Sequence, residues 1–193
     1  MGRLVPLASS KAAVPKDSIE DDNQQQFLTF SVGGELFAVG ILNVKEIIEF
    51  GNLTQIPMMP PFIRGVINLR GSVVPVIDLA ARFGGKPAEI SRRTCIVIIE
   101  IQGEDVDHHD IGVVVDGVNE VLEIPVNAIE PAPTFGAKIR TDFIRGMGKV
   151  GNRFVIILNI DQVLSMNELT QLMGVASAVW SGQEPGMAVP AVG

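Results

Sequence analysis

The chain contains an internal duplication. Residues 62–78, FIRGVINLRGSVVPVID, occur again in altered form from residue 143 as FIRGMGKVGNRFVIILN. An upstream pair of segments, starting at Ala38 and at Gly112, aligns in the same frame and matches Glu46 with Glu120. A duplicated half of roughly 70 residues has a marginal core on its own. We therefore expect the copies to share buried surface.

The local patterns in each copy are those of short strands joined by turns. Gly33-Gly34 separates two apolar segments and predicts a hairpin from Phe27. Residues 41–50 suit a helix or a strand, but their counterpart contains Gly117 and many β-branched residues, which favours a strand. Prolines in residues 57–61 predict a rigid extended connector. Together with the duplication, these signals predict an all-β fold of two small β-barrels placed side by side.

The two ends of the chain have different patterns. The N-terminal region has few large apolar groups after Val14, so ordering it would bury little surface. Near the C-terminus, helical spacing predicts a helix capped by Asp161 and stopped by Gly174. The expected parts are a flexible tail (1–26), a first half (about 27–90), a second half (about 94–165), and a helix end with a mobile tail (166–193), with exchange of elements between the halves left open.

The composition indicates a folded protein without a membrane segment. Apolar residues make up 47% of the chain, yet no run approaches the ~18 apolar residues that span a bilayer. A net charge of -7 argues against nucleic acid as a partner, because phosphate backbones are bound by clustered Lys and Arg. The N-terminus has no secretory signal pattern, and the single cysteine, Cys95, lies in an apolar run that predicts a buried strand thiol. We expect a cytoplasmic protein.

Two motifs resemble ligand sites but fail on their context. The segment GMGKVG, residues 146–151, matches G-x-G-x-x-G but precedes a strand, whereas a dinucleotide site requires a helix there. An acidic and histidine-rich segment has adjacent histidines that would point to opposite sides of a strand, with no distant Cys or His to complete a metal site. We expect that segment to be a solvated turn, and no metal or cofactor; its residues are Asp105, Asp107, His108, His109 and Asp110.

Catalysis is not expected. The chain has no tyrosine, only 2 histidines and no G-x-S-x-G elbow, so a nucleophile, a base and an orienting acid cannot be assembled.

Residues that could form a binding surface are more informative. Arg70 lies in NLRG at the first bend, while the second copy has Lys149-Val150-Gly151-Asn152 there. A residue needed only for folding should occur in both copies, although an ordinary exposed arginine is the alternative. Met58, Met59 and Met147 suit either an adaptable binding surface or core filling.

Five segments resemble successive motifs of the CheW family of bacterial chemotaxis coupling proteins: FLTFSVGGELFAVGILNVKEI, FIRGVINLRGSVVPVIDL, IGVVVDGVNEVLEI, IEPAPTF and FIRGMGKV…VIILNID. The resemblance runs from about Phe27 to Leu164. It implies two five-stranded, SH3-like β-barrels around a hydrophobic interface. It also implies a non-catalytic adaptor that joins transmembrane chemoreceptors to the histidine kinase CheA and is recruited from the cytoplasm to membrane receptor arrays.

The resemblance also implies two contact regions. Val44, Glu46 and Arg70 match positions associated with the receptor's helical hairpin tip, which would lie in a groove between the barrels. We expect Glu46 and Arg70 to pair and so orient the guanidinium group. Kinase contact is expected at the barrel ends, at Ile63, Gly65 and Val66, because the regulatory domain of CheA resembles the family itself.

Three other functions remain open. The first is an adaptor of the same build in a non-flagellar chemosensory pathway, which the sequence cannot separate from the first reading; Phe37-Ala38-Val39-Gly40 and Asn43 depart from the family's usual pattern and leave the partner's identity open. The second is a small-barrel protein that binds a ligand or nucleic acid, against which the 5% aromatic content and the acidic charge count. The third is an enzyme, which would need converging titratable groups in a closed pocket.

Overall fold

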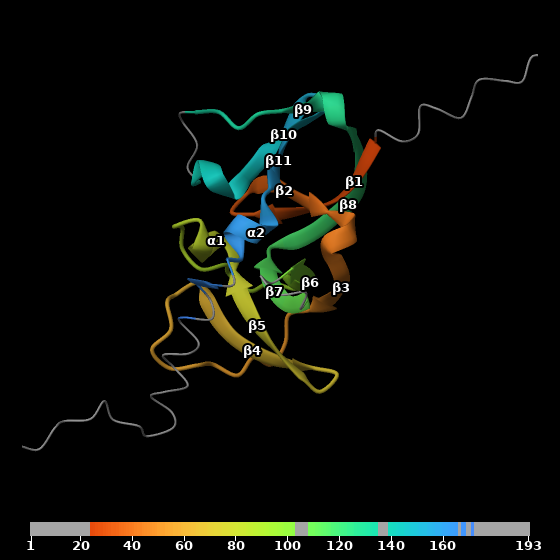
Figure 1. Cartoon of the computed structure of the whole chain (residues 1–193). Helices are drawn as coiled ribbons and strands as arrows, with labels where there is room; N and C mark the ends of the chain where they lie inside the picture. The colour runs from red at the N-terminus through yellow and green to blue at the C-terminus, as the bar shows by residue number, and fades with distance from the viewer. Residues whose placement is uncertain (1–23, 103–107, 135–138, 166, 169–170, 172–193) are drawn as a thin grey trace, which may run out of the picture.

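The computed structural model describes residues 24–102, 108–134, 139–165, 167–168 and 171. They form two sheets of mostly antiparallel strands. In Figure 1 the two curved sheets lie one above the other. In spatial order, the five-stranded sheet consists of β3 (Val44–Glu49), β6 (Cys95–Gln102), β7 (His108–Val115), β5 (Ser72–Asp78) and β4 (Ile63–Leu69). The six-stranded sheet consists of β8 (Gly117–Pro125), β1 (Gln24–Val32), β2 (Glu35–Gly40), β11 (Arg153–Leu158), β10 (Ile144–Val150) and β9 (Ile129–Glu130).

The all-β prediction is confirmed, with one difference in strand number. Two five-stranded units were expected, and one sheet has six strands because the two-residue strand β9 pairs with β10. The segment equivalent to β9 in the first copy makes only an isolated bridge, between Thr54 and Val66. The predicted first hairpin is confirmed, since β1 and β2 pair around Gly33 and Gly34, which both have positive φ.

The two copies exchange their first hairpins. Hairpin β1–β2 of the first copy lies between β8 and β11 of the second copy, and hairpin β6–β7 of the second copy lies between β3 and β5 of the first. The joints are equivalent, because β5 runs parallel to β7 and β11 runs parallel to β2. Each sheet is therefore built from both copies.

One hydrophobic core connects the two sheets. Its buried members come from β1, β2 and β11 of one sheet, from β4, β5, β6 and β7 of the other, and from the short helices beside them, so the expected sharing of buried surface is confirmed. Rings of Phe37, Phe83 and Phe143 follow one another through it, with centroids 5.2 and 6.3 Å apart. Apolar burial of this kind is the main stabilising contribution to a small domain. The sheets should therefore fold as one unit.

Short helices connect the strands. They are η2 (Ile41–Asn43), α1 (Leu79–Arg82), η3 (Val126–Ala128), η4 (Thr141–Phe143) and α2 (Ile160–Val163). The turn after β5 is α1, which Asp78 caps by accepting a hydrogen bond from the Ala81 N–H. Among the described residues, no helix is long and apolar enough to cross a membrane.

Three local expectations need correction or lie outside the described residues. Asp161 was expected to cap the C-terminal helix, but α2 begins after Asn159, and Asp161 lies in its first turn. His108, His109 and Asp110 were expected in a solvated turn but belong to β7. Cys95 is in a strand as predicted, but it is only half-buried. Residues 1–23 and 172–193, including Gly174 and most of both expected tails, lie outside the description, as do Asp105 and Asp107.

Candidate functional site

The β4–β5 hairpin ends in a two-residue turn formed by Arg70 and Gly71. Their φ angles are 51° and 87°, and two successive positive φ angles define the type I′ turn that suits the twist of a hairpin. The Asn68 side chain accepts a hydrogen bond of 2.9 Å from the Gly71 N–H and fixes the turn. An arginine in this conformation costs about 1–2 kcal/mol relative to glycine, because its Cβ crowds the backbone. Local folding therefore does not explain why Arg70 is there.

Arg70 makes a two-pronged contact with Glu46 on β3. Arg70 Nη1 lies 3.1 Å from Glu46 Oε1, and Nη2 donates to Oε2 at 3.1 Å, so the pairing expected from the sequence is present. The Arg70 side chain is 79% exposed and that of Glu46 is 25% exposed. An ion pair this exposed adds little stability. Its main effect is to orient the guanidinium plane, which still presents free N–H groups to solvent.

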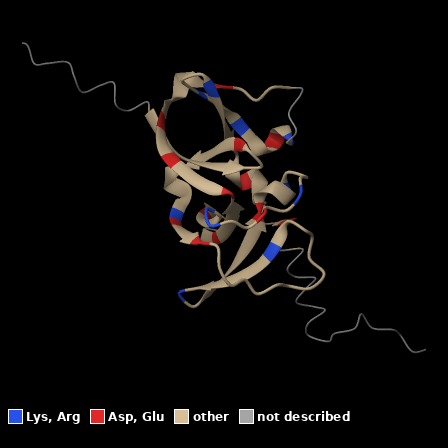
Figure 2. Cartoon of the chain, turned by 180° about the vertical axis from the view of Figure 1, so that it is seen from behind, with Lys and Arg blue, Asp and Glu red and all other residues tan. Residues whose placement is uncertain are grey.

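A shallow depression of about 360 Å³ surrounds this pair. Its wall continues through Lys45, whose Nζ lies 2.9 Å from Glu100 and 2.8 Å from Asp110. Hydrogen bonds, chiefly to Asp110 and secondly to Glu100, raise the pKa of Lys45, so Lys45 is protonated near neutral pH. Figure 2 shows that basic and acidic residues are interspersed along the described ribbon. The depression thus offers charges of both signs rather than a basic face.

Val44 lies at the start of β3, two residues before Glu46. It is half-buried and packs against the core shared by the sheets. The structure therefore brings Glu46 and Arg70 together, with Val44 close by in sequence but turned partly to the interior. Lys45 and Asp110 also line the depression, and the sequence analysis did not assign them to it. Asp110 could not be placed there from the sequence, because β7 reaches this sheet only through the exchange of hairpins.

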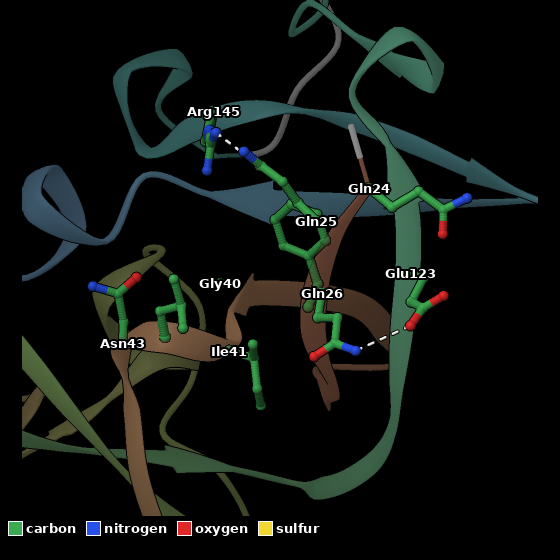
Figure 3. A pocket seen from close by; sticks show the side chains of 10 residues that line it. Gln24, Gln25, Gln26, Gly40, Ile41, Asn43, Glu123 and Arg145 are labelled. Carbon is green, nitrogen blue, oxygen red and sulfur yellow. Dashed lines mark hydrogen bonds between the residues drawn. The ribbon is translucent and has the colours of Figure 1, made fainter. Parts of the chain in front are cut away.

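A second hollow, of about 490 Å³, is lined by residues 40–43, which precede Val44 in the sequence, and by residues of three strands. Figure 3 shows that the start of β1, the residues around η2, the end of β8 and the start of β10 surround it. Leu42 on η2 is 95% exposed at this place. Polar side chains provide most of the remaining lining, namely Gln24, Gln25, Gln26, Asn43, Glu123 and Arg145.

The residues expected to contact the kinase lie mainly inside the fold. Ile63 is 8% exposed and belongs to the shared core. Gly65 has a φ of 145°, and a Cβ there would lie 2.3 Å from the backbone oxygen of Thr54. Val66 is half-buried, and its N–H and C=O both bond to Thr54 at 2.9 Å. Val66 is therefore the residue of the three with surface to offer, while Gly65 allows the close approach of the connector.

The described residues contain no group of three or more His, Cys, Asp or Glu side chains suited to a metal ion. His108 lies 3.9 Å from Glu100, within the charged cluster around Lys45. These groups pair with one another on an open surface. The arrangement suits recognition of another macromolecule rather than chemistry on a small molecule.

The chain matches the family model described as a CheW-like domain over residues 26–168. Its relatives include the chemotaxis protein CheW of Klebsiella aerogenes, 36% identical over 80% of this chain and 90% of the relative. CheW of Bacillus subtilis is 36% identical over 72% and 86%, and protein FrzA of Myxococcus xanthus is 34% identical over 73% and 86%. Among solved structures, the scaffolding protein TtCheW from Thermoanaerobacter tengcongensis is 37% identical with a TM-score of 0.66, covering 74% of this chain and 89% of that one.

These matches agree with the fold. The family comprises non-catalytic scaffold and adaptor proteins, so the expectation that the chain is not an enzyme is supported by its relatives. The chain belongs to the CheW family and is a chemotaxis adaptor.

Proposed function

We propose that this adaptor couples membrane chemoreceptors to the histidine kinase CheA and works in the cytoplasm, where receptor arrays recruit it. The observation that supports this most strongly is Arg70. It is exposed at a hairpin tip, held in a costly backbone conformation and oriented by Glu46. Backbone strain at an exposed polar residue is a recognised feature of binding sites.

The receptor contact uses the surface on both sides of Val44. A receptor's cytoplasmic tip is a helical hairpin, and a helix docks by laying an apolar face on a groove while polar groups at its edge set the register. Val44 supplies apolar surface. Arg70 directs its free N–H groups to carbonyl or carboxylate oxygens of the helix, and Glu46 holds it in place.

The kinase contact uses the end of the five-stranded sheet around Val66. Ile63 and Gly65 shape this surface from within, because one fills the core and the other admits the backbone of Thr54. The regulatory domain of CheA shares the family's build, so the two would stack through equivalent strands and turns. A transient signalling interface of this kind buries on the order of 1,600 Å² or less and allows exchange.

Charge reversal at Arg70 tests the receptor contact. Arg70→Glu places two carboxylates together and should abolish co-sedimentation of the adaptor with receptor-bearing membranes. Arg153→Glu is the matched control, because Arg153 is also exposed and lies next to the corresponding hairpin turn of the second copy, two residues after Gly151, the equivalent of Arg70. The proposal fails if Arg70→Glu sediments as wild type does while its circular dichroism spectrum is unchanged.

A second candidate is an adaptor of the same build in a non-flagellar chemosensory pathway. The match to protein FrzA supports this candidate, because a relative that is 34% identical to this chain has a name other than CheW. Both candidates bind a receptor and a kinase. Pull-down against the CheA-type kinase of each pathway would separate them, since one kinase should be retained selectively.

A further inference from the structure

The duplicated Phe-Ile-Arg-Gly motif places an arginine at the same position in each copy, but the two arginines have different surroundings. In the first copy, Arg64 Nε donates to Asp78 Oδ2 at 2.9 Å, and Nη2 donates to the Ala88 carbonyl at 2.6 Å. Asp78 is fully buried and also accepts from the Ala88 N–H. Arg64 is therefore a structural residue whose charge is neutralised by a buried carboxylate.

In the second copy this neutralisation is missing. The position of Asp78 is taken by Asn159, which carries no charge. The equivalent arginine, Arg145, is exposed, and its guanidinium donates to the neutral side-chain oxygen of Gln25 at 3.1 Å. No carboxylate of the described residues forms an ion pair with Arg145. The second copy has kept the cation without the partner that gives it a structural purpose in the first.

Arg145 lines the hollow beside Leu42. Figure 3 shows Arg145 at one side of this hollow and Glu123 at another, with Gln25 and Gln26 between them. Glu123 accepts a hydrogen bond of 3.0 Å from Gln26, so each charged group is steadied by a glutamine of β1. The hollow thus presents a cation, a separate anion and an exposed apolar side chain. A surface with this charge pattern selects among partners more than it adds affinity.

The hollow and the Arg70 depression lie within reach of one helix. Residues 40–43 line the hollow, and Lys45 and Glu46 line the depression. A segment of seven residues spans at most about 20–25 Å, and a helix of about 15 residues covers the same length. A receptor helix seated on Val44 could therefore contact Leu42 and Arg145 at one end and Arg70 at the other.

We propose that Arg145 is a specificity residue of the receptor-docking surface and binds an acidic side chain of the receptor's helical hairpin. Leu42 packs on the apolar face of the same helix, and Glu123 disfavours a second acidic residue beside it. This inference rests on the proposed receptor contact and adds the chemistry that the receptor must present. It assigns a role to a residue that the Arg70 site does not include.

The test measures binding of the full chain to a soluble receptor hairpin, fused to a dimeric coiled coil, by isothermal titration. Arg145→Glu should weaken binding about tenfold or more, as loss and reversal of a close charge pair does. Arg145→Gln should weaken it less and reduce its dependence on salt concentration. Arg153→Glu, an equal charge change elsewhere on β10–β11, should leave binding unchanged. Arg145 is exposed, so the unfolding midpoints of all variants should match that of wild type.

Charge-reversal substitutions in the receptor hairpin identify the acidic residue that Arg145 binds. Each Asp and Glu of the hairpin is changed singly to Lys, and one change should restore binding to Arg145→Glu while weakening binding to wild type. If Arg70→Glu abolishes binding but Arg145→Glu does not weaken it, the inference is wrong and the proposed receptor contact stands. If wild type does not bind the hairpin at all, the proposed contact and the inference both fall.

Discussion

At the scale of single residues, the two copies have the same hairpin turn but a different residue at one position of it. Arg70 and Gly151 occupy equivalent positions, and both have positive φ, 51° and 60°. Glycine meets this requirement without crowding, whereas arginine does not. The second copy therefore has the residue that the turn favours, and the first copy has the residue that a partner would require.

Replacing Arg70 by asparagine separates these two demands. Asn-Gly is a favoured pair for this turn, so relief of strain should offset the loss of the exposed ion pair with Glu46. We expect the free energy of unfolding to fall by no more than about 0.5 kcal/mol, because the strain relieved is about 1–2 kcal/mol and the exposed ion pair contributes about 0–1 kcal/mol. Sedimentation with receptor membranes should nevertheless be lost. A variant destabilised by several times that amount would show that Arg70 serves the fold.

Gly65 should behave in the opposite way. Gly65→Ala places a Cβ 2.3 Å from the Thr54 oxygen at a φ of 145°, so the connector must move. Strain and overpacking together should cost about 2–4 kcal/mol in urea unfolding. The control is Gly51→Ala, where the nearest atom lies 3.9 Å away, and we expect no comparable loss. Equal stability of the two variants would contradict the close approach that the structure shows.

At the scale of elements, Arg82 ties α1 to the segment after α2. Its side chain is 8% exposed, its Nε donates to the Val163 carbonyl at 3.0 Å, and its other nitrogens pair with both carboxylate oxygens of Glu168. The guanidinium also lies over the rings of Phe62 and Phe143, 4.8 and 5.0 Å from their centroids. Figure 1 shows α1 and α2 side by side at the junction of the sheets, so this contact closes one side of the shared core.

The contact has a defined pH dependence. The hydrogen bonds from Arg82 hold the pKa of Glu168 below its ordinary value of 4.5. A lowered pKa in the folded state contributes stability above the unfolded pKa and loses it as pH falls through the folded pKa. Glu168→Gln should therefore lower the free energy of unfolding by about 0.5–1 kcal/mol at pH 7, a small value because solvent screens a partly exposed ion pair. The difference in stability between the variant and wild type should vanish in acid. Glu35→Gln, at an exposed carboxylate in β2, is the control; a difference that persists below pH 3 would contradict the assignment.

At the scale of the whole molecule, the exchange of hairpins makes the two copies interdependent. Residues 24–90 alone would leave β1–β2 without β8 and β11, and β4–β5 without β7. We expect fragments 24–90 and 94–165 each to be unfolded by circular dichroism and to regain β structure when mixed. A fragment that folds alone, with dispersed amide signals, would show that the shared core is not required.

The sequence predicted those features that depend on short segments and on comparison of the copies. Turn glycines such as Gly33 and the strand character of β3 follow from local pattern or from the aligned repeat, whereas the Glu46–Arg70 pair was expected from the resemblance to the CheW family. The exchange of hairpins could not be predicted from the sequence. With or without the exchange, each strand would pair with strands of the same kind, because the two copies have equivalent strands. One signal was present but not used, namely the alignment of Asp78 with Asn159. It marks the start of α2, and it also reveals that Arg145 lacks the acidic partner of Arg64.

The central claim is that one chain joins a receptor to a kinase, and the most direct measurement is the amount of CheA that sediments with receptor-bearing membranes as the adaptor is added. The account predicts that kinase recovery rises with wild-type adaptor, reaches a plateau and does not rise with Arg70→Glu. Kinase recovery that is the same with and without the adaptor would contradict it.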